Sequence, residues 1–305
     1  MQIVLREFGG LGNQLFQYAA GRYYAKRYAA DLRIAADPDW SAQCNGYPRP
    51  CLLQHFRIAA GLEKRSLLDR TVLTQKPWLK AASVPLKRVL RIGVFAEQPE
   101  QQYTFLRDLP LERNLDTLYL QGYFQTHALV EAVAAELRED LQFREPTLGS
   151  GREFFDQIVH ARNAVSLHIR RGDSVLPWEG KVVLPTAYYD QAISIIRERL
   201  VDPVFFVFSD DIAMAKAALP QDVRSIFVGH NDEFSAHEDL RLMSLCGHHI
   251  LANSTFSWWG AWLNPRKEKT VIAPSRWFVT SEDRHRNLLA PNWILLDTVG
   301  AEALV

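Results

Sequence analysis

Residues 164–173 read AVSLHIRRGD, a run of apolar residues that ends in two arginines and a carboxylate. The run has the length and composition of a buried strand, so Arg170 and Asp173 come where this strand ends. Ligands of open α/β sheets bind beyond the carboxyl ends of the strands, and a guanidinium can hold phosphate oxygens through two parallel hydrogen bonds. This position predicts an anion-binding site in a crevice, with an exposed surface ion pair as the alternative.

The second half of the chain alternates between strands and helices, which predicts a parallel sheet with helices on both faces. Strands are expected over residues 164–169, 204–208, 225–228, 249–252 and 270–273, and helices over 187–200, 212–219, 235–246 and 256–263. The chain is long enough for two domains, and a linker over 143–152 with proline and glycine divides it into domains 1–150 and 151–305.

The first half begins as a βαβ unit and then becomes irregular. Its expected elements are a strand over 3–8, a glycine loop over 9–12, a helix over 13–28, a strand over 32–35 and a closing helix over 126–141. From about residue 40 to 110 the periodicity weakens and prolines accumulate. We therefore expect irregular loops with short helices there, one of them over 86–92.

The charge of the chain is balanced overall and uneven locally. The chain has 35 basic residues (lysine and arginine) and 35 acidic residues (aspartate and glutamate), and this balance argues against a nucleic-acid binder. Residues 64–91 nevertheless hold eight basic residues and one acid, Asp69. We expect a solvated basic face there, and contact with an anionic membrane surface or a charged glycan is the alternative.

Cysteine usage and the first residues indicate the compartment. The three cysteines give no metal-ligand quartet, and Cys44, Cys51 and His55 form only an incomplete zinc set. Reduced thiols of a cytosolic protein fit this count better. The first residues lack the basic leader and the long apolar core of a signal peptide or membrane anchor, so we expect a cytoplasmic protein.

The glycine loop carries four residues able to bind a ligand, Gly10, Gly12, Asn13 and Gln14. Glycines let the backbone approach a ligand, and a helix N-terminus favours negative charge. The loop departs from a dinucleotide-binding fingerprint, because leucine occupies the third glycine position and the next acid comes late. The amides of Asn13 and Gln14 suit sugar hydroxyls as well as phosphates, and helix capping by Asn13 is the alternative.

Acidic residues follow expected strands in both halves. Asp210 and Asp211 end the second strand of the second half, where a carboxylate can accept two N–H groups of a guanine edge; helix capping is the rival role. Asp239, on a later helix, reaches the same ligand or belongs to a solvated acidic face. Asp37 and Asp39 offer a metal site, although a turn explains an acid pair around a proline equally well.

A polar segment follows the strand expected to end at Ala252 and opens the next helix. It supplies hydroxyls and free backbone N–H groups at the positive end of the helix dipole, which suits a pyrophosphate. Its residues are Asn253, Ser254, Thr255 and Phe256. The tryptophans that follow, Trp258 and Trp259, are expected to pack the helix rather than to serve as sugar platforms.

Four motifs, in order along nearly the whole chain, resemble those of the bacterial α-1,2-fucosyltransferases. They are GGLGNQLFQYA at 9–19, HIRRGD at 168–173, FSDD at 208–211 and ANSTFSWWGAWL at 252–263. The resemblance implies a glycosyltransferase-B-type α/β fold in which two Rossmann-like domains face a cleft. It also implies a GDP-β-L-fucose donor bound by the domain over 151–305, a galactose-terminated glycan acceptor on the side of 1–150, inversion at the anomeric carbon, and no essential metal or other cofactor.

The same resemblance implies roles for single residues. Arg170 holds the β-phosphate of the donor, and Ser254 with its two successors surrounds the same pyrophosphate. His168 and one acid of the pair 210–211 lie near the GDP moiety. Asn13 faces the fucose and the incoming hydroxyl.

The general base of this reaction is expected among two acids after the arginines. Asp173 is the first candidate, and Glu179 is the second because the related α-1,6-fucosyltransferases carry a glutamate at a similar distance after the arginine pair. Either acid can instead anchor Arg171. Ser174 stands where many relatives carry tyrosine, so the acceptor contacts near it stay open.

These observations predict an inverting fucosyltransferase that modifies O2 of a terminal galactose in a lipopolysaccharide or capsular repeat unit, or in a free oligosaccharide such as lactose. The alternatives are another nucleotide-sugar donor or linkage, a metal-dependent mechanism through Asp37 and Asp39, and a non-catalytic module that binds a nucleotide sugar or glycan. A dinucleotide-dependent oxidoreductase is disfavoured by the glycine loop. No nucleic acid is expected as a partner. Peripheral contact of the basic residues 64–91 with the inner membrane is the alternative to a solvated face.

Overall fold

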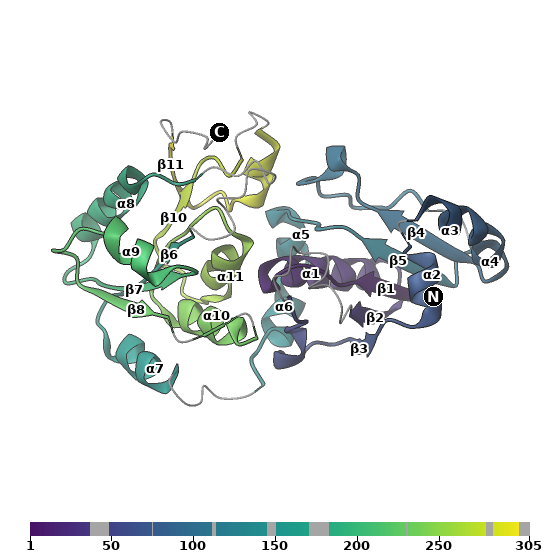
Figure 1. Ribbon diagram of the computed structural model, residues 1–305, viewed down its shortest axis with the longest axis horizontal. Coiled ribbons are helices and arrows are strands. Elements are labelled where there is room, and N and C mark those ends of the chain that lie inside the picture. The colour runs from purple at the N-terminus through teal and green to yellow at the C-terminus, as the bar shows by residue number, and fades with distance from the viewer. Residues whose placement is uncertain are drawn as a thin grey trace. The chain divides into compact units, whose positions relative to one another are not determined.

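The computed structural model describes residues 1–36, 49–74, 76–111, 114–144, 151–170, 183–229, 231–232, 234–278 and 283–298. The chain divides into two units, Met1–Arg144 and Glu145–Val305. Each unit is a parallel sheet covered by helices (Figure 1), so the predicted α/β class is confirmed. The domain boundary that we predict from the sequence lies between residues 150 and 151. Residues 145–150, next to that boundary, lie outside the described part of the chain.

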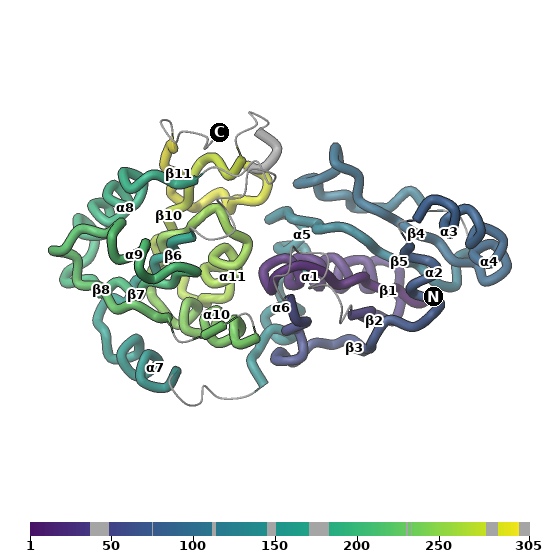
Figure 2. Tube along the Cα trace, in the orientation of Figure 1, coloured from purple at the N-terminus to yellow at the C-terminus, as the bar shows by residue number. Residues whose placement is uncertain are grey.

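The sheet of the first unit has the strand order β3-β2-β1-β5-β4, and each pair is parallel. Its strands are β1 (Gln2–Arg6), β2 (Asp31–Ala36), β3 (Gly61–Lys64), β4 (Ile92–Ala96) and β5 (Thr117–Gln121). The central residues of β1 have no exposed surface because helices cover both faces of the sheet. α1 (Leu11–Arg27) covers one face (Figure 2), so closely that a Cβ on Gly21 would lie 3.0 Å from Cδ1 of Leu32.

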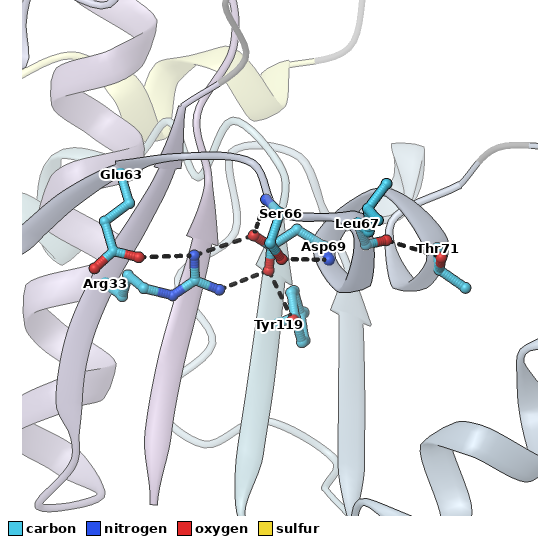
Figure 3. A network of polar contacts seen from close by, with 7 residues as sticks. All are labelled: Arg33, Glu63, Ser66, Leu67, Asp69, Thr71 and Tyr119. Atoms are coloured by element: carbon cyan, nitrogen blue, oxygen red, sulfur yellow. Dashed lines mark hydrogen bonds and ion pairs between the residues drawn. The ribbon is translucent and has the colours of Figure 1, made fainter.

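α2 (Leu67–Val72) covers the opposite face and brings a carboxylate onto it (Figure 3). Asp69 has no exposed surface, and its carboxylate accepts hydrogen bonds from Arg33 at 2.6 Å and from the Tyr119 hydroxyl at 2.8 Å. It also accepts the backbone N–H of Ser66 at 2.8 Å. Burial raises the pKa of this carboxyl, but the hydrogen bonds outweigh burial and lower it to about 2. The ionised Asp69 therefore ties β2 and β5 to α2.

The other helical segments of this unit are short. They are η2 (Leu53–His55), α3 (Pro77–Ala82), α4 (Val84–Val89), η3 (Pro99–Gln101), α5 (His127–Ala132) and α6 (Ala134–Asp140). The single helix predicted over 126–141 is wrong, because the chain breaks at Val133 between α5 and α6. The predicted loop region also contains β3 and β4, which lie at the two sheet edges. β3 is largely exposed and has one large apolar residue, whereas β4 is a short apolar run that contains a glycine.

The sheet of the second unit has the order β11-β10-β9-β6-β7-β8, again with parallel pairs. Its strands are β6 (Ala164–Ile169), β7 (Val204–Ser209), β8 (Ser225–Val228), β9 (His248–Ile250), β10 (Val271–Pro274) and β11 (Ile294–Leu296). From β6 the chain proceeds to β7 and β8 on one side, and then to β9, β10 and β11 on the other. The strand order therefore reverses between β6 and β9, where ligands of such sheets bind.

Helices cover both faces of this second sheet. They are α7 (Gly151–His160), α8 (Thr186–Arg199), α9 (Ile212–Ala218), α10 (Ala236–Leu245) and α11 (Thr255–Leu263), followed by η6 (Asp283–Leu288). α8 and α9 pack on one face, and α7 and α10 pack on the other. The predicted alternation is confirmed, whereas α7, expected to begin as linker, and β11 were missed. Among the helices that the structure describes, none has the length and apolar character to cross a membrane.

Candidate functional site

The arginine motif and the polar segment meet where the strand order of the second unit reverses. Arg170 directly follows β6, and Ser254 comes shortly after the neighbouring β9. Nη1 of Arg170 donates a hydrogen bond to Oγ of Ser254 at 3.3 Å. A guanidinium and a serine hydroxyl thus share the carboxyl edge of the sheet at its switch point.

The N-terminus of α11 lies at the same place. Ser254 is its N-cap, and Oγ of Ser254 also accepts the backbone N–H of Phe256 at 3.3 Å. The side-chain amide of Asn253 donates to the backbone oxygen of Trp277 at 3.1 Å, which fixes the approach to the helix. The first turn therefore adds backbone N–H groups and the positive end of a helix dipole to the guanidinium.

Close packing holds α11 in this position. Trp258 and Trp259 have no exposed surface, and Nε1 of Trp258 donates to the backbone oxygen of Leu288 at 2.6 Å. A Cβ on Gly260 would lie 2.9 Å from Cβ of Met243 on α10, so a side chain there would push the two helices apart. The prediction that the tryptophans pack the helix is confirmed.

His168 lies on β6 next to this edge. It is 8% exposed, and its ring centroid lies 6.0 Å from that of Phe256, in the first turn of α11. The imidazole is therefore held beside the helix N-terminus, two residues before Arg170.

The acid pair after β7 has split roles. Oδ1 of Asp211 accepts the backbone N–H of Met214 at 2.9 Å and caps α9, whereas Asp210 is exposed at the strand end. β7 is the neighbour of β6 on the side opposite β9. Asp210 therefore lies at the edge of the sheet that also holds Arg170, while the carboxylate of Asp211 is engaged by its own helix.

Asp239 lies in the first turn of α10 and has an unusual acidity. Burial raises the pKa of its carboxyl, the neighbouring Glu238 raises it further, and the pKa reaches about 7 although Asn231 donates a hydrogen bond at 2.5 Å. At neutral pH the carboxyl therefore exists in both charge states. Donors that approach it would favour the ionised state.

The glycine loop of the first unit is held by two glutamines of α1. The side-chain amide of Gln14 donates to the backbone oxygens of Gly9 at 2.9 Å and Pro50 at 2.8 Å, and its Oε1 accepts the N–H of Leu52 at 3.0 Å. Gln17 exchanges two hydrogen bonds with the backbone of Phe8. Because Gln14 is fully buried and so engaged, we assign it to the framework of the loop and leave it out of the proposed donor contacts.

Asn13 is the polar side chain of this loop that remains half-buried. Its Oδ1 accepts a hydrogen bond from Nε2 of Gln125 at 2.8 Å. The capping alternative for Asn13 is wrong, because α1 begins at Leu11 with Gly10 as N-cap. Gly9 has a φ of +83°, and a Cβ there would lie 3.0 Å from Nδ2 of Asn13, so glycine is required for this turn.

Two further residues near the loop were missed in the sequence. Both oxygens of Glu97, just after β4, accept the N–H of Phe124 at 3.2 Å, and one accepts that of Tyr123 at 2.7 Å. Burial raises the pKa of Glu97, although these N–H groups lower it in part. Glu97 therefore shapes the turn that leads to Gln125. Arg49 was also missed, and a Cβ on Gly10 would lie 3.9 Å from its Cδ.

Several predicted residues lie outside the described part of the chain. They are the base candidates Asp173 and Glu179, together with Arg171, Ser174, Asp37, Asp39 and Cys44. Within the described ranges, no three His, Cys, Asp or Glu side chains gather in a way that could hold a metal ion. The two cysteines in those ranges, Cys51 and Cys246, are free thiols.

Comparisons with known proteins identify a matching family and two similar proteins. The family model Glycosyl transferase family 11 matches residues 82–297. The O-antigen biosynthesis glycosyltransferase WbnK of Escherichia coli is 32% identical over 309 residues, covering 94% of this chain and 98% of that protein. An α-1,2-colitosyltransferase of Escherichia coli is 29% identical over 308 residues, covering 97% of this chain and 99% of that protein.

A solved structure shows the same fold. The fucosyltransferase NodZ from Bradyrhizobium superposes with a TM-score of 0.51 at 15% sequence identity, covering 86% of this chain and 92% of that one. The fold is thus of the glycosyltransferase-B type, with a Rossmann-like sheet in each unit, as the resemblance of the motifs implied.

Proposed function

The chain belongs to glycosyl transferase family 11, and on this premise we propose that it transfers L-fucose from GDP-β-L-fucose to O2 of a terminal galactose in a glycan. The reaction inverts the anomeric carbon and needs no metal ion. A bond forms between C1 of fucose and O2 of the acceptor, the bond from C1 to the β-phosphate oxygen breaks, and GDP leaves. The proton of the acceptor hydroxyl passes to a general base.

The observation that carries this proposal is the contact between Arg170 and Ser254 at the switch point of the second sheet. A cradle for a pyrophosphate is formed by the guanidinium of Arg170, the hydroxyl of Ser254 and the N-terminus of α11 with Thr255 and Phe256. Charge that develops on the departing β-phosphate oxygen would be stabilised there by groups already in place. In our proposal, these hydrogen-bond donors neutralise the charge that a metal ion would otherwise neutralise.

The nucleoside end of the donor is assigned to residues around the same edge. A carboxylate can accept the two adjacent N–H groups of a guanine edge, and we assign this role to Asp239 or Asp210. Asp239 is the stronger candidate, since a partly buried acid gains more from two donors than an exposed one does. His168 contributes a ring beside the same helix end.

The acceptor side is assigned to the first unit. The amides of Asn13 and Gln125 form a pair after β1 and β5, and such amides bind sugar hydroxyls through both oxygen and nitrogen. Asp173 and Glu179 remain our candidates for the general base. The relative named as a colitosyltransferase supports a second candidate, α-1,2 transfer of colitose, by the same pyrophosphate cradle.

The test is release of GDP from GDP-fucose in excess EDTA, with lactose or N-acetyllactosamine present or absent, for the native chain and Arg170→Ala. We expect release that depends on the acceptor, resists EDTA and is lost in the variant, and NMR of the product should show fucose on O2 of galactose. Tight GDP binding without release would argue against this donor and acceptor. Release from the colitose donor alone would favour the second candidate.

A further inference from the structure

Residues 76–91 form a surface that the fold of the first unit leaves uncovered. α3 and α4 contain no buried residue, and between Lys76 and Arg91 only Ser83, at the junction of the two helices, is buried. Helices of globular proteins are normally stabilised by an apolar face packed on the core. α3 and α4 lack such packing.

Apolar side chains make up much of this surface. Trp78 is 67% exposed and Val89 is 78% exposed, and Val84, Leu86 and Leu90 are each more than one-third exposed. Single exposed apolar residues are ordinary, but four within two consecutive helices and a fifth directly after them form a patch of the kind that marks an interaction site. Because α3 and α4 bury none of these side chains, they contribute little to the core.

The rest of the surface is cationic. Lys76, Lys80, Lys87, Arg88 and Arg91 lie within it, and the segment 76–91 contains no acid, although the whole chain has no net charge. Arg91 pairs with Asp116 at 3.5 Å, whereas the other four cations form no ion pair with any residue that the structure describes. The surface therefore combines unpaired positive charge with exposed apolar groups.

We propose that residues 76–91 bind the surface of an anionic phospholipid bilayer. Lysine and arginine would lie among the phosphate headgroups, while Trp78 and the aliphatic side chains enter the boundary of the acyl chains. Tryptophan is suited to that depth because its ring is apolar and its N–H polar. This contact is independent of the transfer reaction proposed above.

Other occupants fit the surface less well. A second copy of the chain, docked patch to patch, would bring cations against cations. A charged glycan would neutralise the cations and leave Trp78 and Val89 exposed to water. An acidic protein is the remaining competitor, and the experiment below separates it from a bilayer.

The surface also lies away from the loop assigned to the acceptor. α4 leads directly into β4, so α3 and α4 lie at the amino ends of the parallel strands (Figure 1). The glycine loop and Asn13 follow the carboxyl end of β1. Substitutions in the surface should therefore leave transfer to a soluble acceptor unchanged, and this transfer reports that each variant is folded.

The experiment is flotation of the full chain with vesicles of phosphatidylcholine alone and with about one-third phosphatidylglycerol, at low and high salt. We expect binding to the anionic vesicles only, weakened by salt. Lys80→Glu with Lys87→Glu should lower the partition coefficient at least roughly twentyfold, since each cation near such a surface is worth about fivefold. Trp78→Ser with Val89→Ser should weaken the part of the binding to anionic vesicles that persists at high salt.

Matched control variants lie on the second unit. Arg162→Glu with Arg199→Glu makes the same charge change, and Val201→Ser with Phe234→Ser removes two side chains that are each 59% exposed. The proposal is overturned if the native chain does not float with anionic vesicles, or if the controls lose binding as the 76–91 variants do. Quenching of tryptophan fluorescence by brominated lipid should fall in Trp78→Phe. Unchanged quenching would mean that Trp78 stays outside the bilayer and that the surface serves an acidic protein instead.

Discussion

The side-chain amide of Gln125 donates to Oδ1 of Asn13 across 2.8 Å. This contact joins the turn after β5 to the glycine loop after β1, and Glu97 fixes the backbone that leads to Gln125. With Oδ1 held in this way, the amide nitrogen of Asn13 has a defined direction. The proposed contact of Asn13 with a sugar hydroxyl therefore depends on Gln125.

We predict that Gln125→Ala lowers kcat/KM for the acceptor roughly two- to tenfold, the range expected for one hydrogen bond. The affinity for GDP should stay unchanged, because the donor contacts are assigned to the second unit. Steady-state kinetics with varied lactose, beside GDP titration, would check both points. Gln142→Ala, which removes an exposed glutamine of the same unit, is the control and should behave as the native chain.

The pH dependence of GDP binding should report on Asp239. Its pKa of about 7 belongs to the free protein, and guanine N–H donors favour the ionised carboxylate. GDP affinity should therefore be constant well above pH 7 and fall by up to about tenfold per pH unit below it. Calorimetric titrations across this range would measure the slope.

The variant Asp239→Asn should bind GDP more weakly at pH 8 and lose most of the pH dependence. The amide cannot accept on both of its atoms, and it does not titrate in this range. If Asp239→Asn binds GDP as the native chain does while Asp210→Asn is impaired, the guanine contact belongs to Asp210 instead.

The second unit was more predictable from sequence than the first, for physical reasons. Strands such as β6 and β7 are buried on both faces and therefore appear as continuous apolar runs, which also located Arg170 at a strand end. β3 is a largely exposed edge strand with one large apolar residue, β4 is an edge strand whose short apolar run contains a glycine, and β11 is only three residues long.

The candidate site was predictable where a motif adjoined a strand and not where distant segments meet. Ser254 and Arg170 were expected near one ligand, but nothing in the sequence pairs Asn13 with a glutamine 112 positions later. Gln14 and Gln17 carried an available signal, since residues three apart share one helix face, and two amides on that face indicate bonds to the backbone of the loop.

Replacing Arg170 by lysine should be nearly as harmful as replacing it by alanine. A lysine ammonium lacks the planar fork that bonds the Ser254 hydroxyl and that, in our proposal, also holds a phosphate oxygen. We predict a loss in kcat on the order of a hundredfold to a thousandfold for Arg170→Lys, as for loss of one donor to a developing negative charge. Arg162→Lys, at an exposed position of the same unit, should keep full activity. A fall in donor affinity with unchanged kcat would instead show that Arg170 only binds the ground state.

Acid should destabilise the second unit through a buried histidine. His249 has no exposed surface, Nε2 of its ring lies 2.8 Å from Nδ2 of Asn264, and Nδ1 lies 2.8 Å from Oγ of Ser166. Because the amide nitrogen of Asn264 can only donate, Nε2 accepts and the ring is neutral. Burial, with Lys269 nearby, holds the pKa of His249 well below its ordinary 6.5.

The sign of the effect follows from where the proton binds. Below pH 6.5 the unfolded chain protonates this histidine and the folded chain does not, so the stability present above 6.5 is lost as the pH falls, by up to about 1.4 kcal/mol per unit. Urea unfolding, followed by tryptophan fluorescence, to which the buried Trp258 and Trp259 contribute, should show this slope. His249→Gln should be less stable at pH 7.5 and show a shallower slope from pH 6.5 to 5.

The control is His248→Gln. Burial lowers the pKa of His248 as well, but the ring of His248 is only half-buried, so this substitution should change the slope less. An equal slope in the native chain and His249→Gln would assign the acid sensitivity to other groups.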